Sequence, residues 1–283
     1  MITGGDAGLI VTADDFGADV AVNEAVERGH RLGVLSAASL MVTGPAAADA
    51  VARARAMPGL GVGLHLVLVD GRPALPPAAI PDLVDETGRF RAGMVRAGLG
   101  FALRPAVRRQ LAEEIEAQFA AFAATGLRLD HVDAHRHFHL HPVIAGLILR
   151  IGVRYGLRAA RVPLEPRAVL HAVEPATRLA PWPAGPWAQI LERRFRAAGV
   201  RTPDHVFGLA WSGAMTAERL AGLIRLLPPG VSEIYLHPAT HDRFPGHGPG
   251  YRHAGELAAL LDGEVAAAVR ARGLRPGTWT GFA

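Results

Sequence analysis

The sequence contains neither cysteine nor lysine, and both absences exclude chemistry. Without cysteine the chain has no disulfide, no thiolate metal ligand and no cysteine nucleophile, so oxygen and imidazole nitrogen must hold any metal. Without lysine it has no Schiff-base lysine and no phosphate-binding P-loop lysine. All 30 basic residues are therefore arginine. Because these arginines are scattered and the net charge is only +4, nucleic acid is not an expected partner.

Long hydrophobic runs are also missing. Half of the residues are hydrophobic, yet no stretch approaches the ~18 consecutive uncharged apolar residues that a membrane span needs. The first six residues lack the basic and apolar regions of a secretory signal. We therefore expect a soluble, cytoplasmic protein with no transmembrane segment. The composition sets no oligomeric state, and a homodimer is compatible with it.

Short apolar runs alternate with segments of helical periodicity along the chain. Residues 8–13 are the first predicted strand and residues 18–32 the first predicted helix, and the alternation continues to a last long helix at 256–272. This order favours a parallel sheet, closed or nearly closed into a distorted TIM-like (β/α) barrel. No repeat and no low-complexity linker divides the chain. The sequence therefore predicts a single α/β domain over residues 1–283.

Two segments interrupt this alternation. Residues 70–104 are rich in proline and glycine and show no clear period, which predicts a loop insertion and a candidate lid. Residues 163–203 hold many prolines and tryptophans and are predicted to be irregular, with one helix near 187–198. A short strand is predicted just before this segment, at 159–162.

Two adjacent carboxylates, Asp14 and Asp15, stand where the first strand ends and a helix begins. Reactive residues of parallel α/β folds gather at such strand ends. A single aspartate would most simply cap the helix. Two neighbouring acids repel each other and suit a metal site better, because one can bind a cation while the other acts as a base. A lone apolar-flanked histidine is more often a core residue, but His65 also stands at a strand end.

A histidine-rich run gives the strongest local signal. Five of the 13 histidines fall within residues 131–141, beside a further aspartate, Asp133. With a period of two, the odd-numbered residues would share one face of an extended chain. Imidazole is a common metal ligand, so a cluster at a strand end predicts a metal site, although not all five can be ligands. The odd-numbered histidines that follow Asp133 are His135, His137, His139 and His141.

Four strings together resemble the YdjC-like family of carbohydrate deacetylases. They are TADDFG at 12–17, GLHL at 63–66, HVDAHRHFH at 131–139 and LHPA at 236–239, and they extend from the first strand to the last. The resemblance implies a distorted TIM-like barrel and an N-deacetylase, a hydrolase of linear amide carbon–nitrogen bonds. The implied reaction removes acetyl from the N-acetylglucosamine unit of a glycoconjugate.

Two longer strings, GLHLVLVDGRPALPP and RVPLEP, are similar to the branch of that family associated with hopanoid biosynthesis. For this branch the implied substrate is an N-acetylglucosaminyl hopanoid. Such a lipid-linked substrate would bring the protein to the inner membrane surface.

The resemblance also implies a metal site with one divalent ion, zinc or magnesium. The residues that match the family's ligands are Asp15, His65 and His135. They stand at three different predicted strand ends, which a barrel would bring to one rim.

Further roles follow from the same resemblance. Asp14 matches the base that takes a proton from water, and His237 matches the acid that protonates the leaving amine. Arg161 resembles the arginine that steadies the base, although it could also be one of many surface arginines. We assign His137 and His139, within the histidine-rich string, to substrate binding.

Other functions fit the same residues. A chitooligosaccharide deacetylase would use the same site on another acceptor. A phosphoester hydrolase on the same barrel would recruit His137 or His139 to a second metal. A carbohydrate- or lipid-headgroup-binding protein with a structural metal would use the loop at 71–104 and the tryptophans as its contact surface. These tryptophans are Trp182, Trp187 and Trp211, which are more simply core or loop-anchoring residues.

Overall fold

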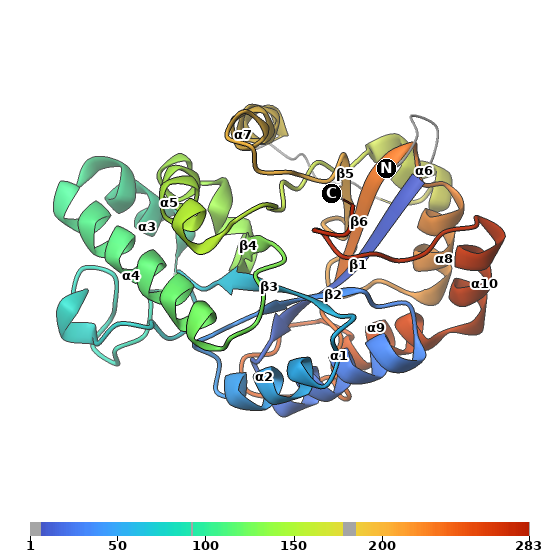
Figure 1. Ribbon diagram of the computed structural model, residues 1–283, viewed down its shortest axis with the longest axis horizontal. Coiled ribbons are helices and arrows are strands. Elements are labelled where there is room, and N and C mark those ends of the chain that lie inside the picture. Colours follow the sequence, from blue (N-terminus) through green and yellow to red (C-terminus); the bar gives the residue numbers. More distant parts are fainter. Residues whose placement is uncertain (1–6, 92, 178–184, 283) are drawn as a thin grey trace.

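The computed structural model describes residues 7–91, 93–177 and 185–282. Its centre is a parallel sheet with the strand order β4-β3-β2-β1-β6-β5 (Figure 1). The middle strand β1 pairs in parallel with β2 on one side and β6 on the other. The strands are β1 (Ala7–Phe16), β2 (Ala37–Leu40), β3 (Gly61–Leu66), β4 (Val132–Ala134), β5 (His205–Phe207) and β6 (Gly230–Leu236).

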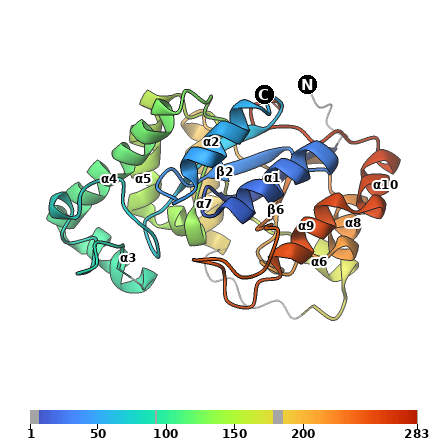
Figure 2. The same ribbon diagram turned by 90° about the horizontal axis from the view of Figure 1, so that it is seen from below.

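Helices surround this sheet in three groups (Figures 1 and 2). The first group is α1 (Val20–Leu32), α2 (Ala47–Arg55) and α9 (His253–Leu261), and the second is α6 (Arg167–Val173), α8 (Ala217–Arg225) and α10 (Gly263–Ala271). The third is α3 (Met94–Leu103), α4 (Pro105–Ala124), α5 (Pro142–Gly152) and α7 (Gly185–Ala197). Short 3₁₀ turns are η1 (Pro77–Ala79), η2 (His135–Leu140) and η3 (Val153–Tyr155).

Local sequence explains where several of these elements begin. The side chain of Asp19 caps α1 by accepting a hydrogen bond from the Ala21 amide at 2.9 Å. Pro105 and Pro142 occupy the first turns of α4 and α5, where a missing N–H costs nothing. The predicted last helix is two helices, because the Asp262 side chain caps the start of α10.

An irregular segment, residues 158–164, joins the two edges of the sheet. Ala160 forms a parallel bridge with Val132 of β4. Farther along, the Leu164 carbonyl accepts a hydrogen bond from Val206 of β5 at 3.0 Å. The regular strand predicted at 159–162 is therefore wrong. Only isolated bridges form, and Pro163 has no N–H with which to continue a ladder.

The single α/β domain with a parallel sheet is confirmed. The described residues form six regular strands, where a regular TIM barrel has eight, and this arrangement is consistent with a distorted barrel. Within these residues, no helix combines the length and the apolar character that crossing a membrane requires.

The two interrupting segments contain more helix than their composition indicates. Residues 70–104 include η1 and α3, which the sequence analysis did not predict. Residues 163–203 include α6, also missed, and α7, which confirms the helix predicted near 187–198. Residues 178–184, with Trp182, lie outside the described part of the chain.

Candidate metal centre

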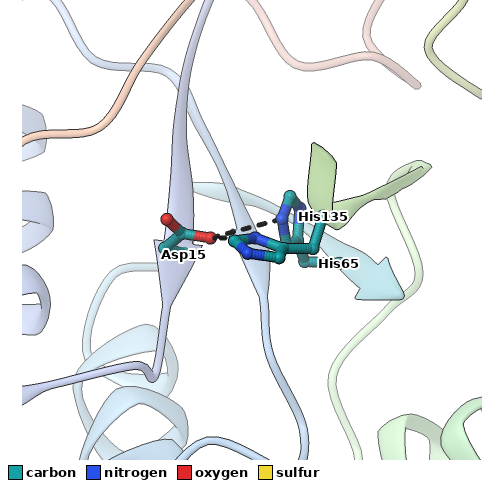
Figure 3. Close-up of side chains that lie close together, drawn as sticks. All are labelled: Asp15, His65 and His135. Carbon is teal, nitrogen blue, oxygen red and sulfur yellow. Dashed lines mark hydrogen bonds and ion pairs between the residues drawn. The ribbon is translucent and has the colours of Figure 1, made fainter. Parts of the chain in front are cut away.

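Three side chains from distant parts of the chain converge at the carboxyl end of the sheet (Figure 3). His135 Nδ1 lies 3.1 Å from Asp15 Oδ1, and His65 Nε2 lies 3.3 Å from the same oxygen. Two ligand atoms bound to one tetrahedral ion at ~2.0–2.1 Å lie roughly 3.3 Å apart, so these separations suit ligation. The three residues predicted as ligands therefore form one potential metal-binding group.

A backbone irregularity places the side chains of both adjacent aspartates, Asp14 and Asp15, at this end of the sheet. Successive side chains of a regular strand point to opposite faces. Between Ala13 and Phe16, however, the pairing of β1 with β2 shifts register, and Asp15 has a left-handed φ of 62°. Non-glycine residues adopt this conformation at a cost, often at functional sites. The shift turns Asp15 towards His65 and His135, whereas Asp14 lies buried beneath.

His65 is oriented by a buried carboxylate that the sequence analysis did not assign. Its Nδ1 lies 2.9 Å from Asp133 Oδ1 on β4, so Nδ1 donates to Asp133 and Nε2 is the nitrogen that would offer a lone pair to a bound metal ion. That Nε2 atom is buried and forms no hydrogen bond among the described residues, although Asp15 Oδ1 lies 3.3 Å away. A buried nitrogen without a partner is costly, and a metal ion would satisfy it.

The charges around His65 and Asp15 also favour a cation. Burial lowers the pKa of His65, but the carboxylates of Asp133, Asp15 and Asp14 outweigh it and raise that pKa well above its usual value. Burial raises the pKa of Asp15, but His135 and His65 hold it well below its usual value. The site between His65 and Asp15 therefore favours a bound cation, and a divalent metal ion would meet this requirement.

The histidine-rich run does not stay extended, so the predicted period-two face is wrong. β4 ends at Ala134, and η2 begins at His135. Arg136 and His137 then adopt left-handed φ values of 54° and 53°. The chain therefore turns immediately after β4, and the odd-numbered histidines diverge. His141 caps α5 by accepting from an amide N–H.

Beneath the metal centre lies Arg161, which is fully buried. Its NH1 and NH2 groups donate to the two oxygens of Asp14 at 2.7 and 2.8 Å, in a bidentate pair. NH1 also lies 2.7 Å from Asp133, and NH2 donates to Glu233 at 2.6 Å. The alternative that Arg161 is a surface arginine is excluded.

Glu233 of β6 is a site residue that the sequence analysis missed. It is fully buried, burial raises its pKa, and both its oxygens accept hydrogen bonds from Arg161. A charged residue inside the apolar strand VSEIYL was a usable signal, because unpaired charges are rarely buried.

His237 follows β6 and faces Asp14, with Nε2 3.9 Å from Asp14 Oδ2. Its position is fixed through its backbone. Its amide N–H donates to Glu256 of α9 at 2.5 Å, and its carbonyl contacts His253 Nδ1 at 2.5 Å. Burial lowers the pKa of His237, although Asp14 and Asp15 oppose this. Glu256 and His253 were not predicted.

Comparison with known proteins identifies the family of the chain. The family model for YdjC-like proteins matches residues 8–271. The chain belongs to the YdjC-like family. A carbohydrate deacetylase of Geobacillus stearothermophilus is 32% identical over 276 residues, covering 96% of this chain and 97% of that protein.

Other relatives match over shorter or more divergent stretches. A chitooligosaccharide deacetylase of Serratia marcescens is 37% identical over 150 residues, 53% of this chain and 57% of that protein. A crystal structure from Enterococcus faecalis V583, described as a cellobiose-phosphate cleavage protein, has a TM-score of 0.76 at 25% identity, covering 98% of this chain and 99% of that one. The predicted resemblance to the YdjC-like family is confirmed.

The two histidines assigned to substrate binding differ in their surroundings. His137 is partly buried, and its Nε2 lies 2.9 Å from the Tyr235 hydroxyl. His139 is only 1% exposed, so its side chain offers almost no surface to a substrate. Burial lowers the pKa of both, that of His139 to about 4, so both rings are neutral.

Proposed function

We propose that this member of the YdjC-like family is a metal-dependent N-deacetylase that removes acetyl from an N-acetylglucosamine unit. The observation that carries the proposal is the convergence of Asp15, His65 and His135 above the buried pair of Asp14 and Arg161. The names of the relatives, carbohydrate deacetylase and chitooligosaccharide deacetylase, support the reaction.

One divalent ion would be held by Asp15 Oδ1, His65 Nε2 and His135 Nδ1. When bound, such an ion polarises the acetyl carbonyl and lowers the pKa of water toward ~7. Two imidazoles and one carboxylate suit zinc better than magnesium, which prefers oxygen ligands. A second group, Asp14 with His65 and Asp133, shares His65 with the first. Since Arg161 already pairs with both of its carboxylates, this second group is a poor second metal site.

The protein's own residues would divide the proton transfers. Asp14, held by two hydrogen bonds from Arg161, would take a proton from the attacking water. His237, whose Nε2 lies 3.9 Å from Asp14 Oδ2, would donate a proton to the departing amine nitrogen. Burial makes His237 a stronger acid by lowering its pKa, which favours this donation. His137 would contact substrate near Tyr235, and we assign no substrate contact to His139.

We propose an N-acetylglucosaminyl hopanoid as the substrate, on the likeness of GLHLVLVDGRPALPP and RVPLEP to the hopanoid-associated branch. A chitooligosaccharide is the second candidate, because the Serratia relative carries that name. The proposed place of action is the inner membrane surface for the first substrate and the cytoplasm for the second.

The test is acetate release by the zinc-loaded protein from an N-acetylglucosaminyl hopanoid and from short chitooligosaccharides, side by side. We expect release from the hopanoid conjugate at the higher rate, and release about 10²- to 10⁴-fold slower from Asp14→Asn. Faster release from chitooligosaccharides would support the second candidate. Absence of acetate from both substrates, with zinc bound, would refute deacetylation.

A further inference from the structure

Two leucines are exposed on the outer face of α3. Leu99 and Leu103 are 58% and 74% exposed, and a spacing of four residues places them one turn apart on the same face of the helix. Among the described residues, no two of the other large exposed hydrophobic side chains lie within one helical turn of each other in the sequence. Single exposed leucines are ordinary on a protein surface, but neighbouring ones form an apolar patch that indicates a contact.

The opposite face of α3 packs on the turn that begins with a metal ligand. Phe101 is only 3% exposed, and its ring centroid lies 5.5 Å from that of Phe138 and 5.8 Å from that of His141. Phe138 belongs to η2, whose first residue is His135, and His141 directly follows η2. The leucines therefore face away from the protein on a helix that covers the segment beside the metal centre.

The chain around α3 has no acidic residue. The arginines are scattered over the sequence as a whole, but residues 87–112 contain six of them and neither aspartate nor glutamate. Elsewhere 24 arginines stand against 26 acidic residues, so this run accounts for the positive net charge of the protein. A surface formed by such a run attracts anionic partners.

Two of these arginines lie at the C-terminal end of α3. Arg108 donates to two carbonyls in the last turn of the helix at 3.2 and 2.6 Å, and because carbonyls are uncharged, its positive charge remains beside Leu103. The side chain of Arg104, the residue after Leu103, is 62% exposed, although it pairs with Asp82 at 2.9 Å. Guanidinium groups therefore adjoin the exposed leucines.

A cavity next to α3 combines the same two kinds of surface. It has a volume of about 220 Å³ and lies between α3, α4 and the segment that precedes α3. Its apolar lining includes Leu83, Phe90, Phe101 and Val107, and its charged lining is Asp82, Arg91 and Arg104. An apolar space bordered by guanidinium groups suits an amphiphile with an anionic head.

An anionic lipid bilayer matches these features together. Its hydrocarbon boundary would take up the leucines, and its phosphate groups would pair with the arginines. A second copy of this chain would also cover the leucines, but a two-fold interface would bring the same arginines together. Nucleic acid would pair with the arginines and leave Leu99 and Leu103 exposed to water.

We propose that α3 and its flanking arginines dock the protein on an anionic lipid bilayer, with Leu99 and Leu103 inserted at the headgroup boundary. The purpose of this contact rests on the proposed function, because a lipid-linked substrate must be reached at a bilayer. The docked helix holds η2, which begins at His135, close to the lipid surface. The contact itself requires no metal ion.

The test is co-sedimentation of the full-length protein with vesicles of phosphatidylglycerol and, separately, of phosphatidylcholine. Leu103→Asn removes one of the inserted side chains. Leu32→Asn is the matched control, because Leu32 is also the last residue of its helix, α1, and is also 74% exposed. In both views α1 lies away from α3 (Figures 1 and 2).

We expect the wild type to bind phosphatidylglycerol vesicles more tightly than phosphatidylcholine vesicles, and added salt to weaken this binding. Leu103→Asn should weaken it about tenfold, whereas Leu32→Asn should leave it unchanged. Equal binding by the two variants, or no preference for phosphatidylglycerol, would overturn the inference. A dimer that Leu103→Asn dissociates, or binding to single-stranded RNA without binding to vesicles, would overturn it in favour of another partner.

Acetate release from chitooligosaccharides separates this inference from the proposed function. Leu103→Asn should release acetate at the wild-type rate, because Leu103 lies outside the proposed metal centre. A protein that binds vesicles but releases no acetate from any substrate would refute the proposed function and leave the docking surface intact. Acetate release without vesicle binding would refute the docking surface alone.

Discussion

Asp133→Asn tests the orientation of His65 most sharply, because asparagine keeps the shape of the side chain. Oδ2 of Asp133 accepts from Ser39 at 2.8 Å and pairs with Arg161 at 2.7 Å, both of which are donors. The amide oxygen must therefore occupy the Oδ2 position. The amide NH₂ group then faces His65 Nδ1, which is 2.9 Å from Oδ1 in the wild type.

Reversing the direction of the hydrogen bond at Nδ1 forces a change of tautomer at His65. Nδ1 would have to accept a hydrogen bond, and the proton would move to Nε2, the atom that faces Asp15. A protonated Nε2 cannot bind a metal ion. Loss of such an outer-shell partner typically weakens metal affinity 10- to 100-fold, or about 1.4–2.7 kcal/mol.

The assay is the Kd for Zn²⁺ by calorimetry, with circular dichroism to verify folding. Asp133→Ala is the control, because alanine offers no amide donor and leaves His65 free to keep its Nε2 lone pair. We expect Asp133→Asn to bind zinc more weakly than Asp133→Ala. Wild-type affinity in Asp133→Asn, or weaker binding in Asp133→Ala, would refute the tautomer argument.

Three further predictions follow from the site. Asp14→Asn and His237→Ala should each lower kcat by about 10²- to 10⁴-fold, measured by acetate release, while dialysis still finds one zinc per chain. Because burial lowers the pKa of His237, the active protonated form is lost as pH rises through a value below the usual one. The rate should therefore fall above that pH, and His237→Ala should not show this fall. A wild-type rate that rises steadily through that pH would contradict the acid role. Burial raises the pKa of Glu256 from 4.5 to about 7, so the folded state binds the extra proton between these values. The free energy of unfolding should drop by up to about 3 kcal/mol as pH rises through that window, and urea titrations of Glu256→Gln at pH 5 and 8 should show no such drop.

The sequence predicts two kinds of element. One kind has a hydrophobic period that extends over many residues, and the other ends in distinctive residues. The alternation of strands and helices and the positions of Asp15, His65 and His135 at strand ends could be read from one sequence, since parallel strands bring their carboxyl ends to one edge. Contacts between distant parts of the chain determined the remaining features of the fold and the site. The turn at Arg136 and His137 uses left-handed conformations, which are uncommon for residues other than glycine.

The supporting residues were harder to predict because they act through partners distant in the chain. Asp133 stood in the histidine-rich string, but its role depends on Ser39 and Arg161, which the fold alone brings to it. Glu256 lies inside a helix, and only the packing of α9 against the end of β6 makes it a support for His237. Single-sequence periodicity contains no information on such pairings.

The most direct test of the central claim is a crystal grown with Zn²⁺ and measured at the zinc absorption edge. We predict one anomalous peak per chain, about 2.0–2.2 Å from Asp15 Oδ1, His65 Nε2 and His135 Nδ1, and no peak in Asp15→Ala. A peak located elsewhere, or a second ion bound by His137 or His139, would contradict it.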